Sequence, residues 1–478
     1  MCSLNTCSCD FNDDFTTKFD EVQILDSELC KKCRIDKPEI ILRKKDGYCK
    51  GCFLINLTHK FRAALGKSKI IHRGDTVLVG YCGRENSTAL LHLIKSGLNE
   101  VANKKIIFNV VIFFIDDGSV EGYTVNERKQ LLETITEQTK TFGFVGYTAS
   151  LEESLCENGI PNIYPMDTPE VVIDENEVIL NILNSLADDS AKEELLRRLR
   201  HRLLILAARK LKCNKIFVAD GATNIAINIL SDISLGRGAQ LSPDIDFSDT
   251  RYLDVMLLRP MRDFTREEII HYLNCNNLNA LRSSKKSKTS TLTSIQALTN
   301  KFISQLDSQF HGTVSTVYRT GGKLLTELLA CQSVEVNSLC ALCNIPLDTK
   351  VTNDEMSALQ ATSFSAFLSS DNVDINNTKE KTNNLLNVKL EEEEQVSHSK
   401  KNNQNKHTDS NIINEKQCTC NNKECKKYMT QSLCLDDILK HLCYSCRLIF
   451  RSSDITKSIP VFVLNAIQTK LLSENRLN

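Results

Sequence analysis

Cysteine pairs of the form C-x-x-C occur four times in this 478-residue chain. Cys30 and Cys33 are followed, after fifteen residues, by Cys49 and Cys52. This is the spacing of a four-thiolate zinc site, in which two tight turns each supply two sulfur ligands. A module this small has little apolar core, so a bound metal would supply much of its folding free energy. We predict an N-terminal zinc module over residues 30–57; the alternative is a chance pairing of buried thiols.

The other two pairs, Cys340 with Cys343 and Cys443 with Cys446, are about a hundred residues apart. The entropic cost of closing a loop grows only logarithmically with its length, so the two pairs can still share one metal. We predict a second zinc site in a split module over residues 336–370 and 413–450. Its ligand set stays open, because further candidate ligands lie close by: Cys418, Cys420, Cys425, Cys434 and His441.

A glycine-containing turn follows the apolar run at residues 76–80 and leads into a helical pattern at residues 88–94. Backbone N–H groups in such a turn, together with the helix dipole, favour an anion such as phosphate. A purely structural turn fits this pattern equally well. The candidate nucleotide-binding residues of the turn are Cys82, Gly83, Asn86 and Ser87.

Basic residues gather in three stretches although the net charge of the chain is only −1, so any nucleic-acid site must be a local patch. Phosphate contacts by such residues give salt-dependent affinity. The alternative for each stretch is an ordinary solvated helix face. The candidate RNA-binding residues are Lys60, Arg62, Lys67, Lys69 and Arg73 in the first stretch and Arg197, Arg198 and Arg202 in the second; the third holds Arg282, Lys285, Lys286, Lys288 and Lys301.

Short apolar runs alternate with helical patterns between residues 75 and 270, which indicates an α/β fold with a parallel sheet and flanking helices. We predict strands at Thr76–Gly80, Asn109–Asp116, Thr141–Thr148, Lys215–Ala219 and Asp254–Leu258. We predict helices at Asn86–Gly97, Tyr123–Thr139 and Ala191–Leu211, and another from about Thr265. The predicted organisation is a flexible N-terminus (1–29), the zinc module, an α/β domain (58–270), a helical basic segment (271–335), the split module with a disordered insert (371–412), and a tail (451–478).

The turn and its surroundings resemble the PP-loop family of ATP pyrophosphatases, whose usual loop is S-G-G-x-D-S. Further matches follow in order: Asp116-Asp117-Gly118, an arginine-rich helix from Arg197, Asp220-Gly221, and Arg259-Pro260-Met261-Arg262. With the two cysteine modules, the chain resembles more narrowly the second-subunit family of the cytosolic tRNA 2-thiolation complex. The resemblance covers roughly residues 28–350 and 440–450.

The resemblance implies a PP-loop fold and a subunit that binds tRNA and a catalytic sister subunit. That complex would thiolate the wobble uridine of tRNA-Lys, tRNA-Glu and tRNA-Gln, with sulfur from a thiocarboxylated ubiquitin-related modifier. ATP binding by this chain is in doubt, because Arg84 replaces a loop glycine and Asn86 an aspartate. The family's catalytic cysteines also have no counterpart; Cys156 and Cys213 are the nearest thiols and are expected to be bystanders.

Two alternatives remain at this point: a self-sufficient ATP-dependent tRNA thiolase, and a zinc-stabilised RNA-binding scaffold without sulfur chemistry. The N-terminus has no apolar signal region, and the most apolar run, residues 106–115, is too short to span a bilayer. We therefore expect a cytoplasmic protein with no membrane partner.

Overall fold

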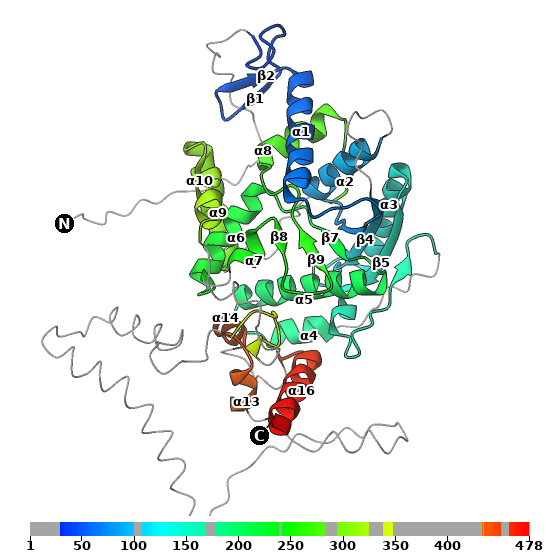
Figure 1. Ribbon diagram of the computed structural model, residues 1–478, viewed down its shortest axis with the longest axis vertical. Helices are drawn as coiled ribbons and strands as arrows, with labels where there is room; N and C mark the ends of the chain where they lie inside the picture. Colours follow the sequence, from blue (N-terminus) through cyan, green and yellow to red (C-terminus); the bar gives the residue numbers. More distant parts are fainter. Residues whose placement is uncertain are drawn as a thin grey trace, which may run out of the picture.

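The computed structural model of the protein (Figure 1) describes residues 29–99, 108–168, 178–238, 241–282, 294–324, 338–347, 433, 435–450 and 458–477. The predicted insert at 371–412 and nearly all of the predicted flexible N-terminus lie outside the described residues. So do three lysines of the third basic stretch and four candidate ligands: Lys285, Lys286, Lys288, Cys418, Cys420, Cys425 and Cys434.

A seven-stranded sheet in the order β6-β5-β4-β3-β7-β9-β8 forms the centre of the molecule. Its strands are β3 (Thr76–Gly80), β4 (Asn109–Asp116), β5 (Val145–Ser150), β6 (Tyr164–Pro165), β7 (Lys215–Phe217), β8 (Ser248–Asp249) and β9 (Met256–Leu258). The five inner strands pair in parallel, whereas β6 and β8 pair antiparallel at the two edges. The predicted α/β fold with a mostly parallel sheet is confirmed.

The central strand shows why this sheet is covered on both faces. Val77, Leu78 and Val79 of β3 are all buried, as expected for a strand between two helical layers. Leu78 packs into a core with α4 (Val178–Ser185) and α5 (Asp189–Lys210), whereas Val77 and Val79 face a second core. The second core is covered by α1 (Lys50–Ser68), α2 (Glu85–Leu98), α3 (Val125–Phe142) and α8 (Arg266–Cys275).

One predicted boundary is wrong, because the predicted strand at Thr141–Thr148 begins inside a helix. α3 continues to Phe142, whose buried ring extends the apolar face of the helix. It ends at Gly143, which has a φ of 78° that glycine adopts at low cost. β5 therefore starts only at Val145.

The N-terminal module shares a helix with the α/β domain. A hairpin of β1 (Ile40–Leu42) and β2 (Asp46–Tyr48) precedes α1, which crosses the predicted domain boundary between residues 57 and 58. α1 buries Phe53, Leu57, Phe61 and Leu65, which recur every four residues and pack into the second core. The N-terminal cysteine module and the α/β domain are therefore joined by one continuous helix, α1.

Further helices pack within and after the sheet domain. They are η1 (Leu151–Leu155), α6 (Ala222–Ser234), α7 (Leu241–Ile245), α9 (Ile295–Gln309), α10 (Thr313–Gly321), α13 (Leu435–Lys440), α14 (Tyr444–Ile449) and α16 (Val461–Leu477). α16 lies where we predicted a tail, and it buries Phe462, Val463 and Ile467 in the first core. Within the described ranges, no helix has the length and apolar character needed to cross a membrane.

Candidate metal centres and cavity

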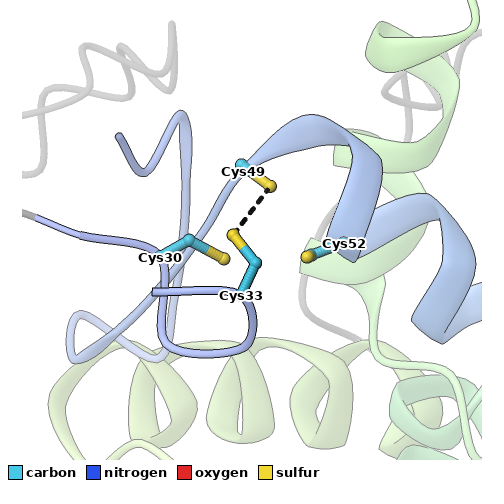
Figure 2. A group of neighbouring side chains, drawn as sticks. All are labelled: Cys30, Cys33, Cys49 and Cys52. Atoms are coloured by element: carbon cyan, nitrogen blue, oxygen red, sulfur yellow. Dashed lines mark hydrogen bonds between the residues drawn. The ribbon is translucent and has the colours of Figure 1, made fainter. Parts of the chain in front are cut away.

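The first four cysteines lie together in the structure, as the C-x-x-C spacing predicts. Cys30 and Cys33 lie in the loop before β1, Cys49 caps α1, and Cys52 lies in the first turn of that helix (Figure 2). Their sulfur atoms all lie within 4.8 Å of one another. The Sγ atoms of Cys33 and Cys49 are 3.9 Å apart.

This geometry fits a tetrahedral metal centre better than disulfides. Four sulfurs at ~2.3 Å from one zinc ion are about 3.8 Å apart, whereas a disulfide requires about 2.05 Å. Burial raises the pKa of the Cys30 thiol, but backbone N–H groups of Cys49, Cys33 and Lys32 outweigh it and lower the pKa to about 6. In the same cluster the Cys52 N–H lowers the pKa of Cys49, but burial and the neighbouring thiols together outweigh it and raise that pKa to about 12. A thiolate is the form that binds metal, so without metal the backbone favours this form at Cys30.

The second group joins Cys340 and Cys343 with Cys443 and Cys446, with all four sulfurs within 4.8 Å of one another. The Sγ atoms of Cys343 and Cys443 are 3.6 Å apart, again close to tetrahedral spacing. The two halves meet through the backbone, because the Ala341 N–H donates to the His441 carbonyl at 2.9 Å. His441, a candidate ligand from the sequence, is not in the group; its Nδ1 lies 2.8 Å from the Asp437 carbonyl oxygen.

Arginines of α5 support this second group rather than forming an exposed basic surface. Arg198 is only 6% exposed and pairs with Glu194 at 2.8 Å and Asp244 at 3.3 Å. Nearby, the Asn344 side chain donates to the carbonyl of Arg251 at 3.0 Å, which ties the cysteine module to the sheet domain. Burial lowers the pKa of Arg198, but the carboxylate of Asp244 outweighs it, so that pKa is raised.

The three candidate arginines of the second basic stretch make contacts within the chain. Arg197 pairs with both Glu194 and Asp232, and its side chain is 30% exposed. Arg202 donates to the carbonyls of Ser154 and Cys156 and lies 3.8 Å from the ring centroid of Phe462. We expected phosphate-facing cations at Arg197, Arg198 and Arg202, but in the structure their guanidinium groups are engaged within the chain.

The first basic stretch divides into two parts. Lys60 donates to both carboxylate oxygens of Glu268, at 2.8 and 2.9 Å, and so joins α1 to α8. Arg62 is half-buried on α1. Lys67, Lys69 and Arg73 are exposed at the end of α1 and in the following loop. The cations free to meet a nucleic acid in this stretch are thus its last three.

The predicted nucleotide loop lies between β3 and α2. Gly83 has a φ of 75°, and its carbonyl accepts the N–H groups of Leu281 and Arg282. The Ser87 hydroxyl donates to the Arg84 carbonyl at 2.9 Å, and the Asn86 amide donates to the Ala219 carbonyl at 3.1 Å. The polar side chains of the loop are used to hold its shape and to join it to the end of β7.

A cavity of about 770 Å³ opens at the carboxyl ends of the parallel strands and includes this loop. Parallel α/β sheets bind their ligands at this edge. The N-terminal turns of α2 and α6 and one side of α9 enclose it. The four predicted loop residues Cys82, Gly83, Asn86 and Ser87 lie in or beside it, and its apolar floor includes Phe113, Ile115, Leu204, Val218, Phe264 and Ile269.

Ion pairs lie along one side of the cavity, and no local sequence pattern predicts them. Arg84 bonds Glu121 at 2.7 Å, while Arg282 bonds both Glu121, at 2.6 Å, and Asp117, at 2.9 Å. Arg200 bonds the other oxygen of Asp117 at 2.8 Å. Burial raises the pKa of Asp117, but Arg200 and Arg282 outweigh it and lower that pKa. The only sequence signal was the acidic pair at the end of the second strand.

The two thiols considered as sulfur carriers lie elsewhere. Cys156 and Cys213 are not among the cavity-lining residues. Burial raises the pKa of both thiols, that of Cys213 to about 11, so neither is a ready thiolate. Cys82 does line the cavity, with its Sγ 3.4 Å from the Ser87 hydroxyl oxygen.

These features define an α/β protein in which two groups of four cysteines flank a parallel sheet with a cavity at its strand ends. The family model described as cytoplasmic tRNA 2-thiolation protein 2 matches residues 294–448. The chain is 30% identical to cytoplasmic tRNA 2-thiolation protein 2-A of Xenopus laevis, over 92% of this chain and 90% of that protein. It is 32% identical to cytoplasmic tRNA 2-thiolation protein 2 of Anopheles gambiae, over 72% of this chain and 80% of that protein.

The chain therefore belongs to the cytoplasmic tRNA 2-thiolation protein 2 family. Among solved structures, it is similar to the U34-tRNA thiolase NcsA from Methanococcus maripaludis, determined with its 4Fe-4S cluster. That likeness has a TM-score of 0.46 and 16% identity, and it covers 65% of this chain and 94% of the thiolase.

Proposed function

We propose that this chain acts in the 2-thiolation of tRNA, as a cytoplasmic subunit that binds tRNA and a catalytic sister subunit. The relatives named above are tRNA 2-thiolation proteins, and the match extends over nearly the whole of this chain. In this proposal the modified base is the wobble uridine of tRNA-Lys, tRNA-Glu and tRNA-Gln. The sulfur comes to the complex from a thiocarboxylated ubiquitin-related modifier.

The altered loop between β3 and α2 supports the proposal that the sister subunit carries out the ATP chemistry. The position where PP-loop enzymes keep a glycine is Arg84, whose guanidinium bonds Glu121 at 2.7 Å. Asn86 stands where PP-loop enzymes keep an aspartate. Its amide donates to the Ala219 carbonyl, and it lacks the negative charge that would help organise magnesium. The family resemblance thus supports a role in thiolation, and the altered loop supports a subunit that leaves ATP chemistry to its partner.

Two further features support RNA binding and metal binding in this role. Lys67, Lys69 and Arg73 offer three exposed cations at and after the end of α1, the helix whose first turn belongs to the N-terminal cysteine module. We propose zinc as the metal, because four thiolates near tetrahedral spacing suit it and its chemistry here would be structural. An iron–sulfur cluster also uses four thiolates, so the metal's identity is part of the test.

The test is deletion of the gene followed by mass spectrometry of nucleosides from bulk tRNA. We expect 2-thiouridine derivatives to fall to background and to return when the wild-type chain is supplied. Purification of the tagged chain is expected to bring down a second α/β subunit and zinc. Unchanged 2-thiouridine would refute the role in thiolation and favour an RNA-binding scaffold. Thiolation by the purified chain alone with ATP would instead favour a self-sufficient enzyme.

A further inference from the structure

The cavity at the strand ends has charged groups, but their charges cancel. Four of its lining residues are cationic and four are acidic: Arg84, Arg200, Arg266 and Arg282, and Glu85, Asp117, Glu193 and Asp220. A polyphosphate needs an excess of cations or a metal to offset its own charge. The cavity that the fold provides is therefore poorly suited to the triphosphate of a nucleotide.

The ion pairs along one side of the cavity also make it poorly suited to phosphate. Arg282 is 4% exposed, and its Nη2 already bonds Asp117 and Glu121. Arg84 bonds Glu121 as well, and Arg200 bonds Asp117. These carboxylates take the positions around the guanidinium groups that phosphate oxygens would otherwise occupy. A phosphate would have to break these charge-assisted hydrogen bonds, including the buried one between Arg282 and Asp117.

Uncharged amides from two helices also line the cavity. Asn224 and Asn228 are four residues apart on α6, and Gln296 and Asn300 are four residues apart on α9, so each pair shares one face of its helix. All four side chains line the cavity. Within the described residues, Asn224 and Asn228 have no hydrogen-bond partner in the chain, and the buried Oε1 of Gln296 has none either.

A cavity lined by both amide and apolar side chains matches one class of ligand. Amides carry both donors and acceptors and pair with the edge of a nucleobase, whereas the floor contacts its flat faces. The floor here includes Phe113, Phe264 and Ile269, and 770 Å³ is ample for one base. RNA-binding proteins commonly recognise bases that have left the stack of a single-stranded loop.

We infer that this cavity binds an uncharged nucleobase extruded from the RNA, rather than the phosphates of a nucleotide. The inference rests on the proposed function, since tRNA supplies the base. Asn224 and Asn228, which line the cavity on one face of α6, bond the edge of the base. The ion-paired wall of Asp117 and Arg282 holds the cavity open without attracting free polyphosphates.

The test uses the full chain, purified with whatever subunit accompanies it, and an anticodon stem-loop RNA in which loop uridines are replaced by photoreactive 4-thiouridine. We expect crosslinked peptides from α6, α9 or the loop before α2. The Asn228→Leu variant keeps the side-chain volume but loses the hydrogen bonds, so it should bind the RNA about tenfold more weakly. Asn214→Leu, at an exposed position outside the cavity, is the matched control.

Crosslinks that are absent, or confined to other peptides, would overturn the inference, as would equal RNA affinities of the two variants. Crosslinks lost on addition of ATP or inorganic pyrophosphate would show a polyphosphate site and overturn it as well. Melting temperatures of both variants report whether Asn228→Leu folds. Loss of 2-thiouridine on gene deletion, with no crosslink in the cavity, would leave the proposed function intact while this inference fails.

Discussion

The two four-cysteine groups have the same ligands but very different surroundings. In the N-terminal group Cys33 and Cys52 are partly exposed, and the hairpin beside them buries Ile40 and Leu42 in a core and packs Tyr48 against it. In the C-terminal group all four cysteines are buried, and all four belong to the core that also includes α5. Figure 1 shows the first module extending from one end of the molecule and the second beneath α5.

This difference shows that C-x-x-C spacing predicts a metal site but not what the metal holds together. At the N-terminus, a metal would order a short hairpin and the first turn of α1. At the C-terminus, it would fix a split module against the arginines of α5, the helix whose residues Glu193 and Arg200 also line the cavity. Loss of metal should therefore have local consequences in the first case and global ones in the second.

The largest expected effect comes from removing one thiol of the C-terminal group. We expect Cys446→Ser to lower the free energy of unfolding by about 5 kcal/mol or more, since structural zinc binds with about 10–16 kcal/mol. The matched change Cys52→Ser should leave the main transition in place and increase amide hydrogen exchange only around the hairpin and the start of α1. Chemical denaturation and hydrogen exchange measure the two effects. Equal losses of global stability would contradict the contrast drawn above.

The next effect in size concerns the buried arginine that supports the C-terminal module. Arg198→Met should cost about 3–5 kcal/mol, because it leaves the carboxylates of Glu194 and Asp244 with one fewer buried cation. Arg209→Met, on the same helix, removes an exposed pair with Asp254 and should cost less than about 1 kcal/mol. Urea denaturation of both variants checks this. A cost for Arg198→Met as small as that of the control would mean that the buried network adds little.

Much of the fold follows from local pattern, and so do the cysteine groups. The apolar runs of β3 and β4 are long enough to predict a buried parallel sheet. The joining of Cys340 and Cys343 to Cys443 and Cys446 was expected in spite of the hundred residues between them, because loop length costs little. Their identity as metal ligands remains a prediction.

The partners of the α5 arginines could not be predicted from the sequence, because a run of cations does not reveal which carboxylates the fold brings near. Of the carboxylates that engage Arg197 and Arg198, only Glu194 lies on α5, while Asp232 and Asp244 come from α6 and α7. The cavity's ion pairs are long-range in the same way, since Arg282 meets Asp117 from 165 residues away. Packing that extends a helix, as at Phe142 and in α16, likewise depends on neighbours that periodicity does not show.

A smaller effect is expected at the junction of the N-terminal module. Lys60 holds Glu268 in a partly exposed pair and lies 4.9 Å from the ring centroid of Phe264. Lys60→Met should cost about 1 kcal/mol, since Glu268 keeps its capping bond to the Thr265 N–H. Thermal melting of this variant beside Arg198→Met compares the two junctions directly. A larger loss for Lys60→Met would reverse their predicted order.

The smallest expected effect is a pH dependence that also separates the two junctions. Burial lowers the pKa of His201 on α5, and this outweighs Asp249, which raises it. The unfolded chain then binds a proton at a higher pH than the folded one, so this contribution is present above about pH 6.5 and is lost as the pH falls below it. For one proton the slope is at most about 1.4 kcal/mol per pH unit.

His271 on α8, whose ring lies edge-on to Phe53 of α1 at 6.2 Å, also has a lowered pKa from burial, partly opposed by Glu267. We expect His201→Gln to flatten the unfolding free energy between pH 5 and 7 more than His271→Gln does, because His201 is more deeply enclosed beside the buried Asp249. Denaturation curves at several pH values in that window measure both slopes. A steeper change for His271→Gln would place the stronger proton linkage at the N-terminal junction, against the difference in burial that distinguishes the two cysteine modules.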